Sequence, residues 1–122
     1  MDSMANPVVH LELNTTDVSK AKAFYGALFD WKSEDVPGGL STFSMLSASR
    51  GTAGGKLRQP AAGASSAWLP YVRVDDIAAA TEKAKLLGAT LVQDVTEVPG
   101  MGWLCVIKDP TGAALGIWKP KT

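Results

Sequence analysis

The sequence lacks the features that mark several large classes of protein. Among its 122 residues, Cys105 is the single cysteine and His10 the single histidine. One cysteine cannot form an internal disulfide bond or supply a zinc site built from several cysteines. Residues 1–7 contain no apolar signal segment, and no stretch approaches the roughly 20 apolar residues that a membrane-spanning helix needs. We therefore expect a cytoplasmic protein that does not bind a membrane.

An excess of charge of either sign is absent as well. Twelve Lys and Arg residues balance twelve Asp and Glu residues, and like charges do not gather in runs. Electrostatic capture of nucleic acid is therefore not expected. With 46% hydrophobic residues, a chain of this length favours one compact core over two independent ones. We predict a single domain over residues 1–122, with a small organic molecule as its partner.

Two glycine-rich stretches do not complete the nucleotide-binding motifs that they suggest. A phosphate-binding loop around Gly55-Lys56 would need Gly at position 50 and Ser or Thr at position 57, where the chain has Arg50 and Leu57. A dinucleotide motif starting at Gly100 would need a third Gly at position 105, which is Cys105. No nucleotide cofactor is predicted.

Residues 8–13 alternate apolar and polar side chains, which predicts a strand with two different faces. A helix is predicted next, capped by Thr16 or Asp17. The apolar residues that recur there at helical spacing are Val18, Ala21, Phe24, Tyr25 and Leu28. We expect this helix to cover one face of the strand. Short strands are predicted at 31–34, 40–46 and 52–57, separated by turns at 37–39 and 50–51.

After an aperiodic connector at residues 58–67, a similar pattern begins again. It predicts a strand at 68–74, then a helix that is capped by Asp75 or Asp76 and ends at Gly88. Three further strands are predicted at 90–95, 101–108 and 113–119. Residues 109–112, Asp-Pro-Thr-Gly, predict a type I turn between the last two strands.

The two halves resemble each other in sequence. A shift of 59 positions places Asp17 on Asp76, Leu28 on Leu87 and His10 on Leu69. This indicates an internal repeat, with one module at residues 7–57 and the other at 68–120. The predicted fold class is α+β, in which each helix covers one face of a mostly antiparallel sheet. The uncovered faces are expected to enclose a cavity.

Several short segments occur in the order found in one known superfamily. They are HLEL at 10–13, Asp17, FY at 24–25, LFDW at 28–31, YVRVDD at 71–76, LGA at 87–89 and DPTG at 109–112. This set resembles the glyoxalase/bleomycin-resistance/extradiol-dioxygenase superfamily, also called vicinal oxygen chelate. The resemblance implies two βαβββ modules that form a U-shaped cleft, and it implies homodimers. It leaves open whether the modules pair within one chain or across the dimer.

The resemblance also implies two metal-ligand positions in each module, and this chain departs from most of them. His10 matches the first position, whereas its counterpart in the second module is Leu69. Gly116 stands where the superfamily has a Glu, and the remaining position falls on Leu57 or Arg58. A single imidazole is too few donors for a divalent metal. We predict no metal and no other cofactor; the alternative is a metal site in which Glu12, Asp94 or Glu97 joins His10.

The candidate ligand-binding residues lie on the faces that the resemblance assigns to the cleft. They are His10, Glu12, Asn14, Leu69, Tyr71, Arg73, Gly116 and Trp118. An aromatic ring beside a guanidinium suits a planar or anionic ligand, and a large ring beside Gly116 and Ala114 can leave a hollow. The alternatives are that His10 is a hydrogen-bonding core residue, that Arg73 neutralises Glu12, and that Tyr71 fills the cleft.

Three functions remain open at this point. The first is the binding of a small, partly apolar organic molecule without a metal, as in the drug-sequestering or uncharacterised glyoxalase-like members of the superfamily. The second is a lyase, isomerase or dioxygenase, either metal-dependent or using Glu12 or His10 as a base. The third is a non-catalytic interaction module whose cleft is filled by its own side chains. Core packing is expected for Trp31, Trp103 and Cys105, although the sequence does not say which sheet face Trp103 and Cys105 occupy.

Overall fold

The computed structural model describes residues 5–36, 40–44, 55–58 and 65–121. The chain divides into two compact units. The first unit is His10–Leu69, and the second is Pro70–Thr122 together with Met1–Val9. In the described part of the chain, no helix is long and apolar enough to cross a bilayer.

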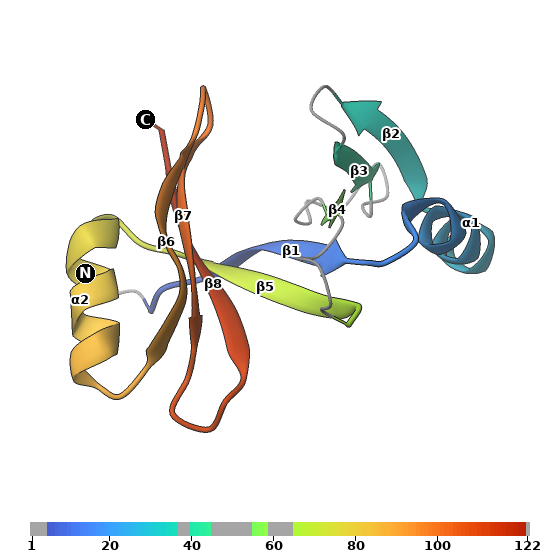
Figure 1. Cartoon of the computed structure of the whole chain (residues 1–122). Helices are drawn as coiled ribbons and strands as arrows, with labels where there is room; N and C mark the ends of the chain where they lie inside the picture. The colour runs from blue at the N-terminus through green and yellow to red at the C-terminus, as the bar shows by residue number, and fades with distance from the viewer. Residues whose placement is uncertain (1–4, 37–39, 45–54, 59–64, 122) are drawn as a thin grey trace. The chain divides into compact units, whose positions relative to one another are not determined.

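Among the residues that the structure describes, the first unit has a helix and four paired strands. Its elements are β1 (Val8–Asn14, which starts in the second unit), α1 (Val18–Phe29), β2 (Lys32–Val36), β3 (Leu40–Ser44) and β4 (Gly55–Arg58) (Figure 1). The strand order is β2-β3-β4-β1. β4 runs parallel to β1, and the other neighbouring strands are antiparallel.

The second unit has the same kinds of element in the same order. They are β5 (Ala67–Arg73, which starts in the first unit), α2 (Ile77–Leu86), β6 (Thr90–Val98), β7 (Gly102–Lys108) and β8 (Ala114–Pro120). The strand order is β5-β8-β7-β6, with β5 parallel to β8 and the other neighbours antiparallel. α2 lies alongside the β6–β8 strands (Figure 1). The predicted α+β class and mostly antiparallel pairing are confirmed.

Most predicted element boundaries are confirmed to within a few residues, but the connector is shorter than expected. Arg58 is the last residue of β4, because its pairing with Asn14 extends the parallel ladder, and Ala67 already belongs to β5. The predicted turns at 37–39 and 50–51 and the ends of two predicted strands, at 45–46 and 52–54, lie outside the described residues.

Asp17 begins α1, because its Oδ1 accepts a hydrogen bond from the backbone N–H of Lys20 at 2.9 Å. The helix covers β1 as predicted: buried Leu13 packs against Val18, Ala21, Tyr25 and Trp31. The apolar residues that make this contact occupy a narrow stripe on α1.

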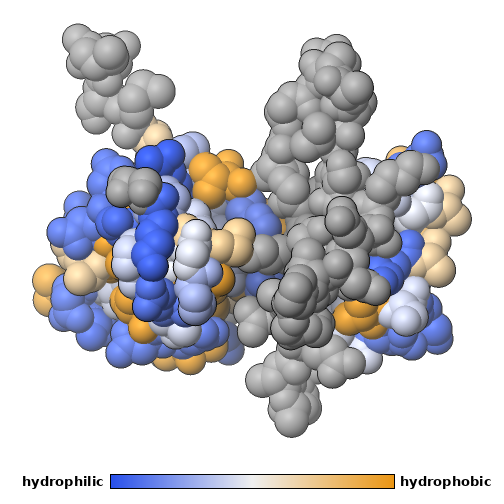
Figure 2. Space-filling view, turned by 90° about the horizontal axis from the view of Figure 1, so that it is seen from above, coloured by the Kyte–Doolittle hydropathy of each residue, from blue (hydrophilic) through white to orange (hydrophobic). Residues whose placement is uncertain are grey.

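Two residues predicted to belong to this stripe do not. Phe24 and Leu28 are 58% and 57% exposed, because they lie to one side of the stripe that faces Leu13. Phe24 instead touches the ring of Tyr25 edge-on, with the ring centres 5.0 Å apart. Elsewhere, hydrophobic residues appear at the surface as spots among hydrophilic ones (Figure 2), as is usual for folded proteins.

The core of the second unit lies between α2 and the sheet. Asp76 caps α2 by accepting a hydrogen bond from Ala79 N–H at 3.0 Å, and Gly88 follows the helix with a φ of +104°, as predicted. The buried core residues are Ile77, Cys105, Ile107 and Ile117, and Ala80 and Ala84 of α2 pack against them. Because Trp103 joins the same cluster, Trp103 and Cys105 both face α2.

The predicted turn between β7 and β8 is present and is closed by Asp109. Its backbone carbonyl oxygen accepts from Gly112 N–H at 2.9 Å. Its Oδ1 accepts from the Thr111 hydroxyl at 2.6 Å and from the backbone N–H groups of Thr111 and Ala113 at 2.8 and 3.0 Å. These hydrogen bonds, led by the one from the Thr111 hydroxyl, lower the pKa of the Asp109 carboxyl below its ordinary value of 3.8.

This turn predicts a pH-dependent contribution to stability. A carboxyl whose folded-state pKa is lowered stabilises the protein above its unfolded-state pKa, and that contribution is lost as the pH falls through the folded-state value. We expect Asp109→Asn to lower the thermal unfolding midpoint near neutral pH, and the deficit to shrink once the pH is well below 3.8. Thermal unfolding followed by circular dichroism checks this. Glu82→Gln, which removes the same charge from an exposed pair with Lys85, serves as the control. A deficit that does not change with pH would contradict the prediction.

Candidate functional site

The polar residues of β1 lie on the face away from α1. Side chains alternate along a strand, so His10, Glu12 and Asn14 are opposite to Leu13, which packs under the helix. Glu12 is only 4% exposed, and His10 and Asn14 are half-buried. Leu69, the counterpart of His10, is buried in the same unit. The first unit therefore places four of the candidate ligand-binding residues at buried or half-buried positions.

The other four candidates form two cross-strand pairs in the second unit. The Cα atom of Tyr71 faces that of Gly116, and the Cα atom of Arg73 faces that of Trp118. Because Ile117 belongs to the core under α2, its neighbours Gly116 and Trp118 lie on the opposite face of the sheet. The structure thus brings these four residues together on the face away from α2.

The ring of Tyr71 lies directly on Gly116. A Cβ atom at position 116 would overlap with Cδ2 and Cε2 of that ring and would lie 2.7 Å from its Cγ. Tyr71 itself is 2% exposed. The space beside Gly116, where a hollow was predicted, is therefore filled by the Tyr71 ring.

The residues present do not fit the metal site that the superfamily resemblance implies. The position of the expected Glu is Gly116, and the Tyr71 ring leaves no room there for a side chain. The counterpart of His10 is the aliphatic Leu69. Within the described ranges, no group of three or more His, Cys, Asp or Glu residues is arranged to hold a metal ion.

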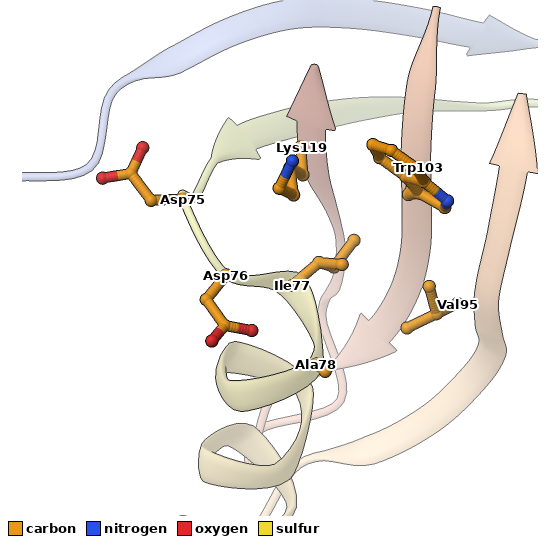
Figure 3. A pocket seen from close by; sticks show the side chains of 7 residues that line it. All are labelled: Asp75, Asp76, Ile77, Ala78, Val95, Trp103 and Lys119. Atoms are coloured by element: carbon orange, nitrogen blue, oxygen red, sulfur yellow. The ribbon is translucent and has the colours of Figure 1, made fainter. Parts of the chain in front are cut away.

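A hollow of about 460 Å³ lies on the other side of the second unit's sheet, at the start of α2. Its lining residues are Asp75, Asp76, Ile77, Ala78, Val95, Trp103 and Lys119 (Figure 3). The eight candidate residues from the sequence are not among them. Sequence reasoning missed this site because the face on which Trp103 lies was undecided; its alternation with Cys105 and Ile107 was the available signal.

Two lysine side chains, those of Lys119 and Lys121, lie close to the Trp103 ring of this hollow. The Nζ atom of Lys119 is 4.6 Å from the centre of the Trp103 ring, and that of Lys121 is 5.3 Å away. Lys121 also donates to Glu97 at 2.6 Å. Both distances to the ring are within the range of a cation–π interaction.

Arg73 borders a second, smaller hollow of about 220 Å³ in the same unit, together with Ala5, Asn6, Pro7 and Asp75. The side chain of Asn6 donates to the carbonyl oxygen of Arg73 at 2.9 Å, and the backbone N–H of Arg73 donates to the carbonyl oxygen of Pro7. The N-terminal segment is thus attached to the end of β5. Arg73, which is exposed, lies at the edge of this hollow.

Known proteins are similar to this chain in sequence. A Mycobacterium tuberculosis protein named "Putative glyoxylase CFP32" is 34% identical over 114 residues, which cover 89% of this chain and 44% of that protein. The "Anthracycline biosynthesis protein DnrV" of Streptomyces peucetius is 28% identical over 123 residues, covering 88% and 45%. The chain therefore spans a little under half the length of these curated relatives.

Solved structures show the same fold at low identity. A glyoxalase/bleomycin resistance protein/dioxygenase superfamily member from Vibrio splendidus matches with a TM-score of 0.65 and 12% identity, covering 96% of this chain and all of that one. A methylmalonyl-CoA epimerase from M. tuberculosis matches with a TM-score of 0.63 and 17% identity, covering 94% and 88%. The model of the family described as a glyoxalase-like domain matches residues 10–117. This chain belongs to the glyoxalase-like domain family, within the glyoxalase/vicinal oxygen chelate superfamily.

Proposed function

We propose that this protein binds small, partly apolar organic molecules without a metal ion, and that within each unit the sheet face pointing away from the helix contacts them. The observation that carries the proposal is the packing of Tyr71 on Gly116, which occupies the place of a metal-binding carboxylate with an aromatic ring. Aromatic and aliphatic walls with a few polar groups are typical of small-molecule sites. The names of the relatives, which refer to a glyoxylase and to anthracycline biosynthesis, also concern small organic molecules.

The polar groups on the proposed binding face of each unit are those that the sequence singled out. Glu12, His10 and Asn14 supply them in the first unit, and Arg73 supplies a cation in the second. Trp118, half-buried and paired in register with Arg73, adds an aromatic surface. Such groups orient a ligand, while the apolar surface provides most of the binding free energy.

Metal analysis tests the metal-free part of the proposal. Protein purified without chelators is expected to hold less than about 0.1 divalent ion per chain, because the described residues offer no group of three or more donors and fewer donors bind such ions weakly. Inductively coupled plasma mass spectrometry checks this before and after dialysis against zinc, nickel, manganese and iron(II). Stoichiometric retention of any of these ions would contradict the proposal.

Ligand screening tests the binding itself. A library of small aromatic and aliphatic compounds should contain members that raise the thermal unfolding midpoint, since a ligand at 100 times its dissociation constant stabilises the folded state by about 2.7 kcal/mol. The shift should be unchanged by EDTA and weakened by Trp118→Ala, with Trp68→Ala as the control, because the Trp68 ring packs against Tyr25 of α1. A midpoint shift that EDTA abolishes would point to a metal-dependent site instead.

A metal-free enzyme is the second candidate, and the burial of Glu12 favours it. A carboxylate that is 4% exposed can act as a general base toward a bound molecule if it lies within hydrogen-bond reach of an acidic C–H group. Deuterium exchange into a ligand found by screening, compared between the wild type and Glu12→Gln, would detect this activity. Homodimer formation and a cytoplasmic location stay predictions.

A further inference from the structure

The hollow at the start of α2 is separate from the site of the proposed function. Trp103 and Ile77, which line it, belong to the cluster on the α2 side of the sheet. Tyr71 and Gly116 lie on the opposite side. A molecule in this hollow would therefore contact neither of these residues.

The walls of the hollow are mostly apolar and still accessible to solvent. Ile77 and Ala78 come from the first turn of α2, Val95 from β6 and Trp103 from β7 (Figure 3). Val95 is 37% exposed and Trp103 is half-buried, so a ligand resting on them would remove apolar surface from water. The volume of about 460 Å³ is within the range of small-molecule sites.

The lining carries two carboxylates and one ammonium group, and the ammonium group is the charge that lies next to Trp103. The ammonium group of Lys119 lies 4.6 Å from the Trp103 ring centre, which keeps it at the edge of the apolar wall. Figure 3 shows the carboxylates of Asp75 and Asp76 pointing away from Trp103, and Asp76 is engaged as the cap of α2. The second cation near this ring, Lys121, is paired with Glu97.

We propose that this hollow binds a small aromatic monocarboxylate. Its ring lies against Trp103 and Val95, and its carboxylate is held by the ammonium group of Lys119. The aromatic ring of the ligand can stack on the indole ring of Trp103. The carboxylate matches the one cation in the lining, and a charge-assisted hydrogen bond fixes its position.

Three probes that share one ring system test the charge preference. They are 2-naphthoate, 2-naphthylmethanol and 2-naphthylmethylammonium. Each is titrated into ¹⁵N-labelled protein while the backbone amides of Ala78 and Val95 and the indole N–H of Trp103 are followed by NMR. We expect 2-naphthoate to bind most tightly and to shift these three signals. Tighter binding of either other probe, or shifts confined to β1, β5 and β8, would overturn the proposal.

Matched variants test the role of Lys119. Lys119→Gln should weaken 2-naphthoate binding by at least about tenfold, the lower end of the usual effect of losing a hydrogen bond to a charged group, and should leave 2-naphthylmethanol binding unchanged. Lys119→Arg should restore most of the loss. Lys108→Gln removes the same charge at the exposed end of β7 and should have no effect. Equal 2-naphthoate affinity in the wild type and Lys119→Gln would overturn the assignment.

A substitution that changes only the size of a side chain tests the location of the site independently of charge. Ala78 is an exposed residue in the first turn of α2, so Ala78→Leu fills the hollow without adding atoms to the buried core. Binding of both 2-naphthoate and 2-naphthylmethanol should fall in this variant. Unchanged binding would place the probes elsewhere and overturn the proposal. Neither result bears on the proposed metal-free site on the opposite sheet face, because none of these variants changes a residue of that site.

Discussion

Replacing Gly116 with alanine is expected to lower the free energy of unfolding by about 2–3 kcal/mol, an overpacking cost at the upper end of the usual range. A methyl group at this position would overlap with the Tyr71 ring. The ring has little room to retreat, because Tyr71 is nearly fully buried. Urea denaturation of the wild type and the variant measures the difference.

Gly26 provides a matched control for this substitution. Gly26 lies inside α1. The atom nearest to a Cβ added at this position would be the carbonyl oxygen of Trp31 at 3.4 Å, which is an ordinary contact distance. Gly26→Ala should therefore stabilise the protein by about 0.5–1 kcal/mol through helix propensity. Two Gly→Ala changes in one protein are thus expected to have opposite signs, because only one position is overlaid by a side chain.

A double-mutant cycle shows whether the ring causes the effect. Tyr71→Ala alone should cost about 3–5 kcal/mol, the range for deleting a buried aromatic side chain. Adding Gly116→Ala to that variant should cost almost nothing, because the overlapping atoms are gone. An equal cost of Gly116→Ala in both backgrounds would show that the ring is not responsible. The same overlap means that a Glu at position 116 could not recreate a metal ligand while Tyr71 remains.

The order of elements was predictable because its determinants are local. The alternation at residues 8–13 places Leu13 under a helix and Glu12 on the other face, which the structure confirms. Asp17 and Asp76 cap the two helices through hydrogen bonds to residues only three positions ahead. Features that depend on neighbouring residues in the chain can be read from the chain.

The features that were missed or left undecided depend on contacts between distant residues. Whether Tyr71 lines a hollow or fills it depends on the register that puts it opposite Gly116, 45 positions later in the sequence. The helical spacing of Phe24 does not reveal that only part of the apolar stripe of α1 meets β1. The face of Trp103 likewise follows from the packing of β7 under α2.

Cys105 is expected to react with thiol reagents at least about 10³-fold more slowly in the native protein than in the unfolded chain, because reaction requires an opening whose free energy approaches that of unfolding. Its side chain is fully buried, and burial raises the pKa of the thiol, which disfavours the reactive thiolate. A hydrogen bond donated by Thr81 would oppose this increase. The Thr81 hydroxyl, however, already donates to the carbonyl oxygen of Ile77 at 2.7 Å, so it accepts from the Cys105 thiol at 3.3 Å.

Labelling with 5,5′-dithiobis(2-nitrobenzoate) at about pH 8, near the ordinary pKa of a cysteine thiol, measures this protection, with and without urea. The matched control carries Cys105→Ala and Ala79→Cys, which moves the single thiol to an exposed position on α2. The control should react at nearly the same rate with and without urea. Native-state labelling of Cys105 within about tenfold of the control would mean that the packing of Ile77 and Ile117 around the thiol opens readily. That result would contradict a rigid core beneath α2, and with it the fixed placement of Trp103 at the wall of the hollow.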